Sequence, residues 1–480
     1  MISNFEKFKI SKEIVKALSE LGYEKPTDIQ DKVIKEFLLN KDLVVRAQTG
    51  SGKTASYVVP ICEKIKWEEN NPQALILTPT RELAVQVAED VKNIGRFKRI
   101  KSVPVYGKES FKEQTNKIKG KTHVIVGTPG RVLDHIDRKT LITEDIKYLV
   151  IDEADEMLNM GFIRQIEAVF RRLPKKRVVS LFSATMPPEI VDLSKKYLHR
   201  PLNIQLENEN LVVDKIDHII YITDGKQKLS NLKALLIKEK PETCVVFCRT
   251  KENVDIAYDF LVKNNYSVNK IHGGMMQKDR LNVMEEFKKG RYRILVATDI
   301  ASRGIDVENV THVINLDIPL EKEAYVHRIG RSARAGKSGK AITFITKFED
   351  RYLNDIEDLI GFKIKEEDIN KLEYSQDEEE AAKKYLSKTN KKKIPKGNKL
   401  NSQIVKLYFN GGKKKKIRAV DFVGTISNIE NINSEDIGII EIKDNGSYVE
   451  ILNGKGKIVL NAMKERTIKG KKLRVEIANK

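Results

Sequence analysis

Two groups of residues have the types and spacing needed to hydrolyse a nucleoside triphosphate. Asp152 and Glu153 follow the apolar run 148–151, and the loop Ala-Gln-Thr-Gly-Ser-Gly-Lys-Thr at 47–54 follows the apolar run 43–45. Both runs are typical of buried strands, and the carboxyl ends of parallel strands meet at one edge of a sheet. The sequence therefore predicts that carboxylates and a phosphate-binding loop lie at the same edge.

The loop departs from the strict P-loop pattern only at Ala47, where that pattern has glycine. Gly50 and Gly52 allow backbone N–H groups to face a phosphate, Lys53 supplies a positive charge, and Thr54 offers a hydroxyl to Mg²⁺. The alternative is a Gly/Ser turn with an incidental lysine. The predicted nucleotide ligands of this loop are Ala47, Gln48, Thr49, Gly50, Ser51, Gly52, Lys53 and Thr54.

The two carboxylates have different predicted roles. Mg²⁺ prefers oxygen ligands, so Asp152 is assigned to the metal together with Thr54. Glu153 is then placed to orient and deprotonate the attacking water. The alternative is an acidic, solvated helix N-terminus, which the position directly after a buried run makes less favourable.

Three arginines recur at every third position in the segment 325–336, at Arg328, Arg331 and Arg334. Residues at this spacing share a face of a helix, and guanidinium groups are permanently charged donors. The bland alternatives are a basic solvated face and an RNA-binding patch. Because the other half of the chain is predicted to hold a triphosphate, we favour arginine fingers that complete its site.

Two sets of apolar runs must position these residues. The first set is 43–45, 74–77, 124–126, 149–151 and 178–182; the second is 243–247, 268–271, 293–297, 310–315 and 341–345. Each set alternates with helix-like segments, which predicts two α/β domains with parallel sheets at 1–208 and 214–362. The segment 207–214 is the expected hinge.

The composition changes after the second domain. Residues 363–402 are rich in charge and predict a charged helix followed by a flexible basic linker. Residues 403–480 then follow the order β-α-β-β-α-β, with strands at 404–409, 437–442, 448–451 and 472–477 and helices at 418–426 and 456–463. This order predicts a small α+β domain with the ferredoxin-like fold of RNA-recognition motifs (RRM-like).

The overall charge favours a polyanionic partner. The formal net charge is +20, and nucleic acid is the expected partner. No run approaches the roughly 18 apolar residues of a membrane span, and the first residues lack the layout of a signal peptide. Cys62, Cys244 and Cys248 are expected to be buried free thiols. We therefore expect a cytoplasmic protein without a membrane partner.

In their order along the chain, these motifs resemble those of DEAD-box RNA helicases over residues 5–344. The matching blocks are 22–30 with Phe5 upstream, 47–54, 79–83, 128–131, Asp152-Glu153-Ala154-Asp155, Ser183-Ala184-Thr185, 246–250, 272–274 with Gln277 and Arg280, 298–306 and 325–336. The resemblance implies two RecA-like domains, ATP with Mg²⁺ as cofactors, and RNA as the partner.

The resemblance also implies roles for residues outside the phosphate loop. Gln30 would read the adenine edge, Phe5 would stack on the ring, and Tyr23 belongs to the same block. Asp306 would bind the ribose, and Arg331 and Arg334 would contact the γ-phosphate. The residues that would couple hydrolysis to RNA release are Asp155, Ser183, Thr185, His327 and Arg328, of which Arg328 would tie the arginine block to the DEAD box.

An RNA groove is implied on both RecA-like domains. It would hold phosphates and 2′-hydroxyls rather than bases, so binding would be nearly independent of sequence. The implied groove residues are Thr80, Arg81, Gly130, Arg131, Arg249, Gln277, Arg280, Thr298 and Arg303. Lys108 stands where the family often has a second glycine, and a phosphate contact there would offset the lost backbone freedom.

The C-terminal domain resembles the RNA-binding domain of the DbpA and YxiN branch, through 408–412, 421–424 and 468–475. That resemblance implies a hairpin of 23S-type ribosomal RNA and pre-ribosomal large-subunit particles as partners. Gly446 replaces one exposed aromatic of an ordinary RNA-recognition motif, and Glu450 would repel phosphate, so Tyr448 is given a secondary role. The main predicted contacts form a basic edge: Lys413, Lys414, Lys415, Lys416, Arg418, Lys469, Lys471, Lys472 and Arg474. The alternative is that 413–416 is merely a solvated loop.

The sequence thus predicts a monomeric ATP-dependent RNA helicase that locally separates short duplexes in large-subunit assembly. A rival interpretation is an ATP-dependent RNA clamp or scaffold with little unwinding. Another is a DNA translocase, which the 2′-hydroxyl dependence would distinguish.

Overall fold

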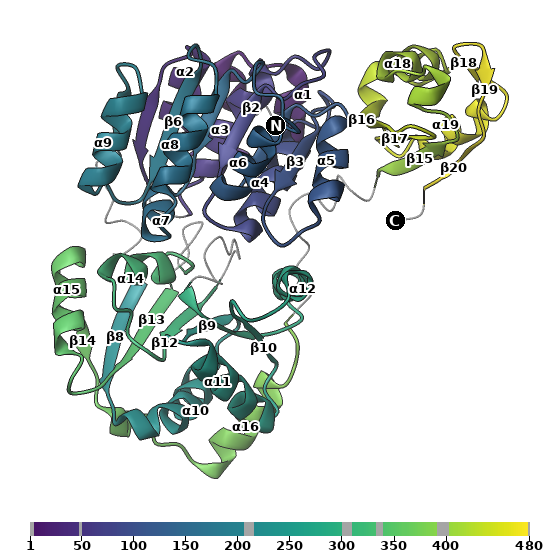
Figure 1. Cartoon of the computed structure of the whole chain (residues 1–480). Coiled ribbons are helices and arrows are strands. Elements are labelled where there is room, and N and C mark those ends of the chain that lie inside the picture. Colours follow the sequence, from purple (N-terminus) through teal and green to yellow (C-terminus); the bar gives the residue numbers. More distant parts are fainter. Residues whose placement is uncertain are drawn as a thin grey trace. The chain divides into compact units, whose positions relative to one another are not determined.

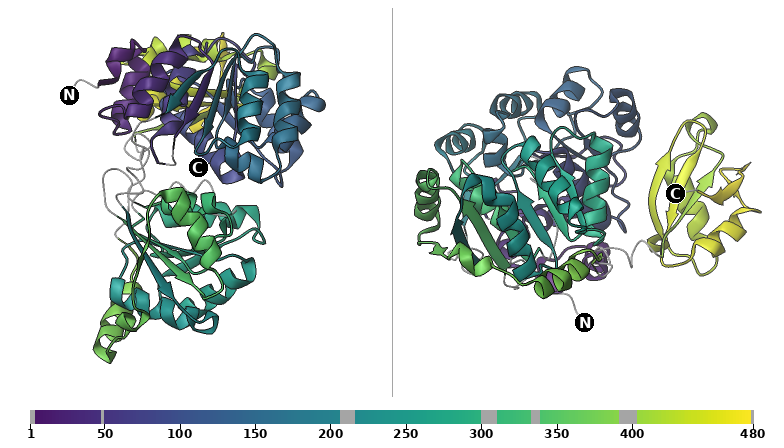
Figure 2. Two further views of the ribbon diagram at one scale, coloured as in Figure 1. Left: turned by 90° about the vertical axis from the view of Figure 1, so that its left-hand side faces the viewer. Right: turned by 90° about the horizontal axis from the view of Figure 1, so that it is seen from below.

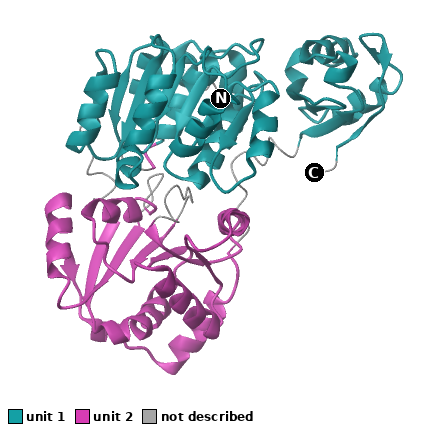
Figure 3. Ribbon diagram, in the orientation of Figure 1, with its two compact units in different colours: residues 1–47, 52–206, 396–480 teal, residues 48–51, 207–395 magenta. Residues whose placement is uncertain are grey.

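The computed structural model describes residues 4–47, 50–205, 216–299, 310–332, 339–390 and 403–478. Three larger sheets, each with its own helices, and a two-stranded sheet organise these residues (Figure 1, Figure 2). The chain divides into two compact units, residues 1–47, 52–206 and 396–480, and residues 48–51 and 207–395 (Figure 3).

The first sheet has seven parallel strands in the order β3-β4-β2-β5-β6-β1-β7. The strands are β1 (Leu43–Arg46), β2 (Ala74–Leu77), β3 (Ser102–Val105), β4 (Val124–Gly127), β5 (Tyr148–Ile151), β6 (Val178–Ser183) and β7 (Leu202–Gln205). The strands β1 and β5, which precede the predicted phosphate loop and carboxylates, are separated only by β6. The topology therefore brings these two motifs to neighbouring strand ends.

Both faces of this sheet are buried. Along β2, Ala74 and Ile76 join one hydrophobic cluster, whereas Leu75 and Leu77 join another. Alternating side chains point to opposite faces, which is why the central strands are apolar throughout. The helices are α1 (Lys12–Glu20), α2 (Asp28–Leu38), α3 (Lys53–Lys64), α4 (Arg81–Ile94), α5 (Phe111–Lys119), α6 (Pro129–Asp137), α7 (Ala154–Asn159), α8 (Ile163–Arg172) and α9 (Pro188–Tyr197), after a short 3-10 turn η1 (Asn4–Phe8).

The second sheet repeats this design with parallel strands in the order β10-β11-β9-β12-β13-β8-β14. Its strands are β8 (Ile216–Ile222), β9 (Cys244–Phe247), β10 (Val268–Ile271), β11 (Ile294–Ala297), β12 (His312–Asn315), β13 (Gly339–Ile345) and β14 (Lys365–Glu366). Its helices are α10 (Lys228–Glu239), α11 (Lys251–Lys263), α12 (Gln277–Lys288), α14 (Lys322–Ile329), α15 (Asp350–Ile360) and α16 (Gln376–Leu386). Cys62, Cys244 and Cys248 are buried free thiols, as predicted.

The charged helix that the sequence predicts within 363–402 forms as α16 (Gln376–Leu386), and it packs on the second domain. Ala382 and Leu386 of α16 are buried in the core of the second domain, and Glu378 pairs with Lys238 at 2.9 Å. After the helix, the Asn390 side chain donates to the Glu242 carbonyl at 2.6 Å. Composition suggested a solvated segment because its charges are dense, but a narrow apolar stripe is enough to dock a helix.

The C-terminal sheet is antiparallel, in the order β16-β17-β15-β20. Its elements are β15 (Val405–Phe409), α18 (Ala419–Ser427), β16 (Ile437–Ile442), β17 (Ser447–Ile451), α19 (Gly456–Met463), β18 (Thr467–Ile468), β19 (Lys471–Lys472) and β20 (Val475–Ile477). The predicted β-α-β-β-α-β order is confirmed. Its last strand is shorter than predicted, because Lys471 and Lys472 form a separate hairpin with β18.

The fold class is confirmed: two RecA-like parallel-sheet domains are followed by a small α+β domain. Within the described ranges, no helix is long and apolar enough to cross a membrane. The predicted hinge 207–214 lies outside the described residues.

Candidate nucleotide and RNA sites

The phosphate loop leads directly into a helix N-terminus. Helix α3 begins at Lys53, and Gly52 precedes it with φ 92°. A Cβ atom at Gly52 would lie 2.5 Å from Nε2 of Gln30, so glycine is required by both conformation and space. The helix N-terminus and its N–H groups suit an anion. Gln48 and Thr49 of this loop lie outside the described residues.

The carboxylates lie where β5 ends, and both are buried. Asp152 Oδ2 accepts a hydrogen bond of 2.7 Å from the Tyr57 hydroxyl. Burial raises the pKa of Asp152, while Lys53 and the Tyr57 hydrogen bond oppose that rise. Glu153 has φ 56°, a left-handed conformation that is strained for a side chain other than glycine. Strain of this kind is found at functional sites, and here it fixes the predicted base at the start of α7.

Two buried polar atoms fit a metal–triphosphate ligand. Lys53 is 7% exposed and Asp152 is 3% exposed. Among the described residues, neither Lys53 Nζ nor Asp152 Oδ1 has a hydrogen-bond partner. Leaving such groups unsatisfied is costly, and a bound phosphate and cation would satisfy both. The donor set therefore fits ATP with Mg²⁺.

Asp155 joins the DEAD box to the Ser-Ala-Thr block. Its Oδ2 accepts from the Thr185 backbone N–H at 2.8 Å and from the Thr185 hydroxyl at 3.0 Å. Its own N–H donates to the Ser183 hydroxyl at 3.1 Å. The structure therefore brings these three predicted coupling residues together, although their role in coupling stays a prediction.

The predicted adenine-binding residues have other partners in the structure. Gln30 donates to the Gly52 carbonyl at 3.2 Å and accepts from the Thr27 N–H at 3.1 Å, so it links α2 to the phosphate loop. Phe5 is fully buried, with Phe8 and Tyr23 as ring neighbours. The Phe5 ring belongs to the hydrophobic core of the first domain, and its stacking on adenine stays a prediction. Tyr23 is only half-buried.

The predicted RNA contacts of the first domain gather at the carboxyl ends of β2, β3 and β4. The Thr80 hydroxyl accepts from the Leu83 N–H at 3.3 Å, so it caps α4. Arg81 lies against Gly107, and Gly130 begins α6. Arg131 donates to the Glu109 carbonyl and to Gln114, which hold it in place. These partners make the groove residues well positioned, but no described contact tests RNA binding.

Lys108 keeps the backbone shape that its position requires. It has φ 62° and an exposed side chain. Glycine would adopt this conformation without strain, whereas lysine pays about 1 kcal/mol or more. The predicted phosphate contact at Lys108 is therefore sterically open.

Arg328, one of the predicted arginines of the second domain, has partners within that domain. Arg328 forms a two-fold ion pair with Asp299, with distances of 2.5 and 2.7 Å, and donates to Asn315 at 2.9 Å. Its expected tie to the DEAD box stays a prediction, since Asp299 and Asn315 satisfy the guanidinium here.

Other predicted site residues of this domain, with roles in the groove, in coupling or at the γ-phosphate, lie along its strand and helix ends. Arg249 pairs with Glu349 at 2.7 Å. Arg280, His327 and Arg331 are buried, Gln277 begins α12, and Thr298 follows β11. Asp306, Arg303 and Arg334 lie outside the described residues.

The basic edge of the C-terminal domain is built from two loops. Lys469 donates to the Lys416 carbonyl at 3.1 Å, and Lys471 donates to the Lys415 carbonyl at 2.8 Å. These bonds hold the β18–β19 hairpin against residues 413–416. Except for the half-buried Lys415, the predicted cations of this edge are exposed. Their charges therefore gather on one accessible surface.

Sequence reasoning missed a second aromatic residue on the sheet. Tyr408 of β15 pairs in register with Tyr448 of β17, and their ring centroids are 5.2 Å apart. A Cβ atom at Gly446 would lie 2.5 Å from the Tyr408 ring, so the glycine makes room for that ring. The sequence could have indicated this residue. Side chains two positions apart on a strand lie on one face, which places Tyr408 on the same face as Lys406. Glu450 lies beside Lys406 on this face and is buried.

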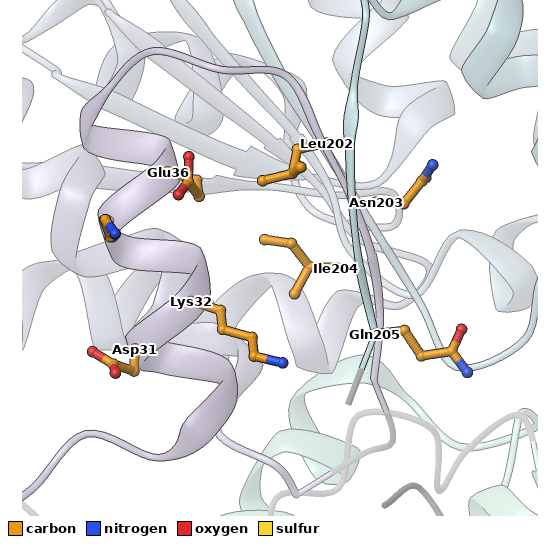
Figure 4. Close-up of a pocket in the computed structure, with 8 residues that line it drawn as sticks. Asp31, Lys32, Glu36, Leu202, Asn203, Ile204 and Gln205 are labelled. Atoms are coloured by element: carbon orange, nitrogen blue, oxygen red, sulfur yellow. The ribbon is translucent and has the colours of Figure 1, made fainter. Parts of the chain in front are cut away.

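A groove of about 340 Å³ lies between α2 and β7, away from these motifs. Side chains of the helix face those of the strand across it (Figure 4). Asp31 pairs with Lys7, and Glu36 pairs with Lys41, each at 2.7 Å. The groove therefore carries balanced charge, and we assign it no ligand.

Three families match successive parts of the chain. They are the DEAD/DEAH box helicase at residues 27–193, the helicase conserved C-terminal domain at 227–336, and the DbpA RNA binding domain at 406–477. The ATP-dependent RNA helicase DbpA of Bacillus subtilis is 56% identical over the full length of both chains. The CshA helicase of Geobacillus kaustophilus is 45% identical over 74% of this chain and 76% of its own.

Solved structures of related helicases share the fold of the two RecA-like domains. Dbp5 of S. cerevisiae bound to RNA and ADP BeF3 has a TM-score of 0.72 and 30% identity, covering 80% of this chain and all of that one. Mss116p bound to ssRNA and AMP-PNP has a TM-score of 0.69 and 28% identity, covering 80% and 81%. The chain therefore belongs to the DEAD-box family of ATP-dependent RNA helicases, and within that family it is of the DbpA type.

Proposed function

We propose that this helicase locally separates short RNA duplexes during assembly of the large ribosomal subunit, and that its C-terminal domain targets it to a ribosomal RNA hairpin. The observation that carries the targeting step is the basic edge, where two loops gather exposed lysines on one surface. Clustered cations favour a polyanion, and the phosphates of structured RNA supply closely spaced negative charge. The matched DbpA RNA binding domain supports the same choice.

Hydrolysis is assigned to the buried edge of the first sheet. Glu153 would accept a proton from the attacking water, and Lys53 would contact the phosphates. Thr54 and Asp152 would hold Mg²⁺, which supplies charge neutralisation at the phosphate oxygens when it is bound with ATP. Arg331 and Arg334 remain the predicted γ-phosphate ligands. We place the protein in the cytoplasm as a monomer, as the sequence predicts.

Tethering explains why a targeting domain would help. Once the C-terminal domain holds its hairpin, the helicase domains meet nearby duplexes at a raised effective concentration. Strand separation would then be directed by location rather than by base reading in the groove. The 12 residues 391–402 between the last described residue of the second domain and the C-terminal domain limit that reach to about 40 Å.

The proposal is tested by crosslinking the full chain to total cellular RNA and mapping the crosslinked positions. We expect sites clustered around one hairpin of the large-subunit ribosomal RNA. A variant with Lys414→Glu and Lys472→Glu should lose this cluster, because both lysines are exposed on the basic edge and neither is one of the lysines that tie the loops together. Crosslinks spread evenly over cellular RNA would contradict targeting.

Strand release is tested separately with a short duplex beside the mapped hairpin. Helicase action predicts that ATP releases the shorter strand. RNA-stimulated ATP turnover without any release would instead favour an RNA clamp or scaffold. Replacing the RNA by DNA of the same sequence should abolish stimulation, because the groove is predicted to contact 2′-hydroxyls.

A further inference from the structure

Tyr57 connects two elements that carry predicted metal ligands. It lies one helical turn after Lys53 on α3, and its hydroxyl donates to Asp152 Oδ2 at 2.7 Å, across 95 residues of sequence. The ring is fully buried. A hydrogen bond to a carboxylate is stronger than one between neutral groups, so this contact can fix the Asp152 rotamer.

Thr54, the other predicted metal ligand, lies on the same helix, three residues before Tyr57. The hydrogen bond from Tyr57 to Asp152 therefore ties the helix that carries Thr54 to the carboxylate at the end of β5.

Packing leaves the tyrosine little freedom. Its ring lies against Phe182 of β6, with centroids 5.0 Å apart and planes at 59°. Strand β6 lies between β1, which leads into the phosphate loop, and β5, which leads into Asp152. The ring is therefore held at the junction of the two motifs that it links.

This contact leaves one carboxylate oxygen for a ligand. Tyr57 occupies Oδ2 of Asp152, while Oδ1 is buried without a hydrogen-bond partner among the described residues. We propose that Tyr57 is a positioning residue of the nucleotide site, which holds Asp152 in the geometry that receives Mg²⁺ together with Thr54. The inference rests on the proposed assignment of the metal to these two residues.

If Tyr57 merely filled the core, a different result would be expected when its hydroxyl is removed. A core role depends on the ring, and the hydroxyl would then only satisfy a buried carboxylate. The change Tyr57→Phe keeps the ring and its packing while it removes the hydroxyl. The two roles are separated by whether the variant changes the response to Mg²⁺.

The test measures binding of a fluorescent, non-hydrolysable ATP analogue to the full chain, first in a chelator and then over a series of Mg²⁺ concentrations. Parent protein should bind more tightly when Mg²⁺ is added. In Tyr57→Phe we expect the Mg²⁺-dependent gain to fall by about ten-fold, since a hydrogen bond to a charged group is lost. Affinity in the chelator should be unchanged, and kcat for ATP should fall with little change in KM for RNA.

Tyr197→Phe is the matched control in the same domain. Its hydroxyl also donates to a carboxylate, that of Glu167 at 3.2 Å, but at the far end of α9. This variant should show the parent's Mg²⁺ response. Thermal unfolding without nucleotide should place all variants within a few degrees of the parent, which establishes that each is folded.

Two results would overturn the inference in distinguishable ways. If Tyr57→Phe keeps the full Mg²⁺-dependent gain while Asp152→Asn loses it, the metal assignment stands and Tyr57 has no positioning role. If Asp152→Asn also keeps the gain, the proposed metal site is wrong, and the role of Tyr57 fails with it.

Discussion

The nucleotide edge of the first sheet and the basic edge of the C-terminal domain are built in opposite ways. At the nucleotide edge, Lys53, Asp152 and Glu153 are each less than a tenth exposed. At the basic edge, the Arg418 and Arg474 side chains are 71% and 77% exposed. Chemistry requires fixed donors in a low dielectric, whereas capture of a polyanion needs only gathered charge.

The two regions should consequently respond differently to mutation. At the buried nucleotide edge, a change of one atom should strongly reduce catalysis, because the contacts of each side chain are few and fixed. At the exposed basic edge, one lysine can partly replace another, so the loss of RNA affinity should depend on the number of charges removed. Each of the following changes tests one side of this contrast.

The largest effect is expected for Glu153→Gln. The change preserves size at a buried position but removes the base, so kcat for RNA-stimulated phosphate release should fall by about 10²–10⁴-fold. Binding of ATP and RNA, measured by fluorescence anisotropy, should be retained. Turnover near that of the parent would exclude Glu153 as the base.

Leu386→Ala should cause the next largest effect, on stability rather than chemistry. Leu386 is fully buried where α16 packs on the second domain, so truncation should cost about 2–5 kcal/mol of unfolding free energy. Denaturant unfolding of the full chain measures this. Tyr385→Ala is the control, at a neighbouring residue that is 38% exposed, and it should lower the unfolding free energy by less. Equally small losses in the two variants would show that residues 376–386 act as a linker.

Thr185→Val should have a smaller effect that falls on coupling. The change removes the 3.0 Å hydrogen bond to Asp155 Oδ2, while the backbone N–H groups of Ala184 and Thr185 still donate to the same oxygen. We expect strand separation to slow by about three- to ten-fold with ATP turnover nearly unchanged. An equal loss of both rates, measured side by side, would place Thr185 in the chemistry and not in coupling.

The smallest effect is expected on the tyrosine pair of the C-terminal sheet. Stacking on bases is worth about 1–3 kcal/mol when it occurs. The sheet also carries Glu441 and Glu476 beside Tyr448 and Tyr408, so we expect Tyr408→Ala to weaken hairpin binding less than three-fold. A loss of ten-fold or more would move RNA binding from the basic edge to the sheet.

The sequence predicted the central strands well because strands buried on both faces are continuous apolar runs. It missed β3 and β7, which lie at the two edges of the first sheet, and β8, which lies next to the edge strand β14 of the second sheet. In β7 only Ile204 is buried, so its sequence has no apolar run to detect. The charged helix at 376–386 was predicted, but its docking on the second domain was not, because its buried stripe is narrow and its charges dominate the composition.

The motifs predicted which residues gather at the nucleotide edge but not how they are held. The Tyr57 hydroxyl donates to Asp152, which is 95 residues away in the sequence, and Arg328 pairs with Asp299, which is 29 residues away. Such partners are set by tertiary packing, and neither residue type nor local spacing announces them. The burial of Phe5 in the core of the first domain is likewise set by tertiary packing, and its predicted stacking on adenine is still to be tested.

The most direct test of the contrast compares RNA-stimulated ATP turnover in two variants with equal charge change. Lys414→Glu with Lys472→Glu alters the basic edge, and Lys457→Glu with Lys464→Glu alters exposed lysines outside it. For ribosomal RNA containing the mapped hairpin, the first variant should need about 100-fold more RNA for half-maximal stimulation, with kcat unchanged. The second should match the parent, and both should respond normally to unstructured RNA. An equal loss in the two variants, or a fall in kcat in the first alone, would contradict the separation of RNA capture from chemistry.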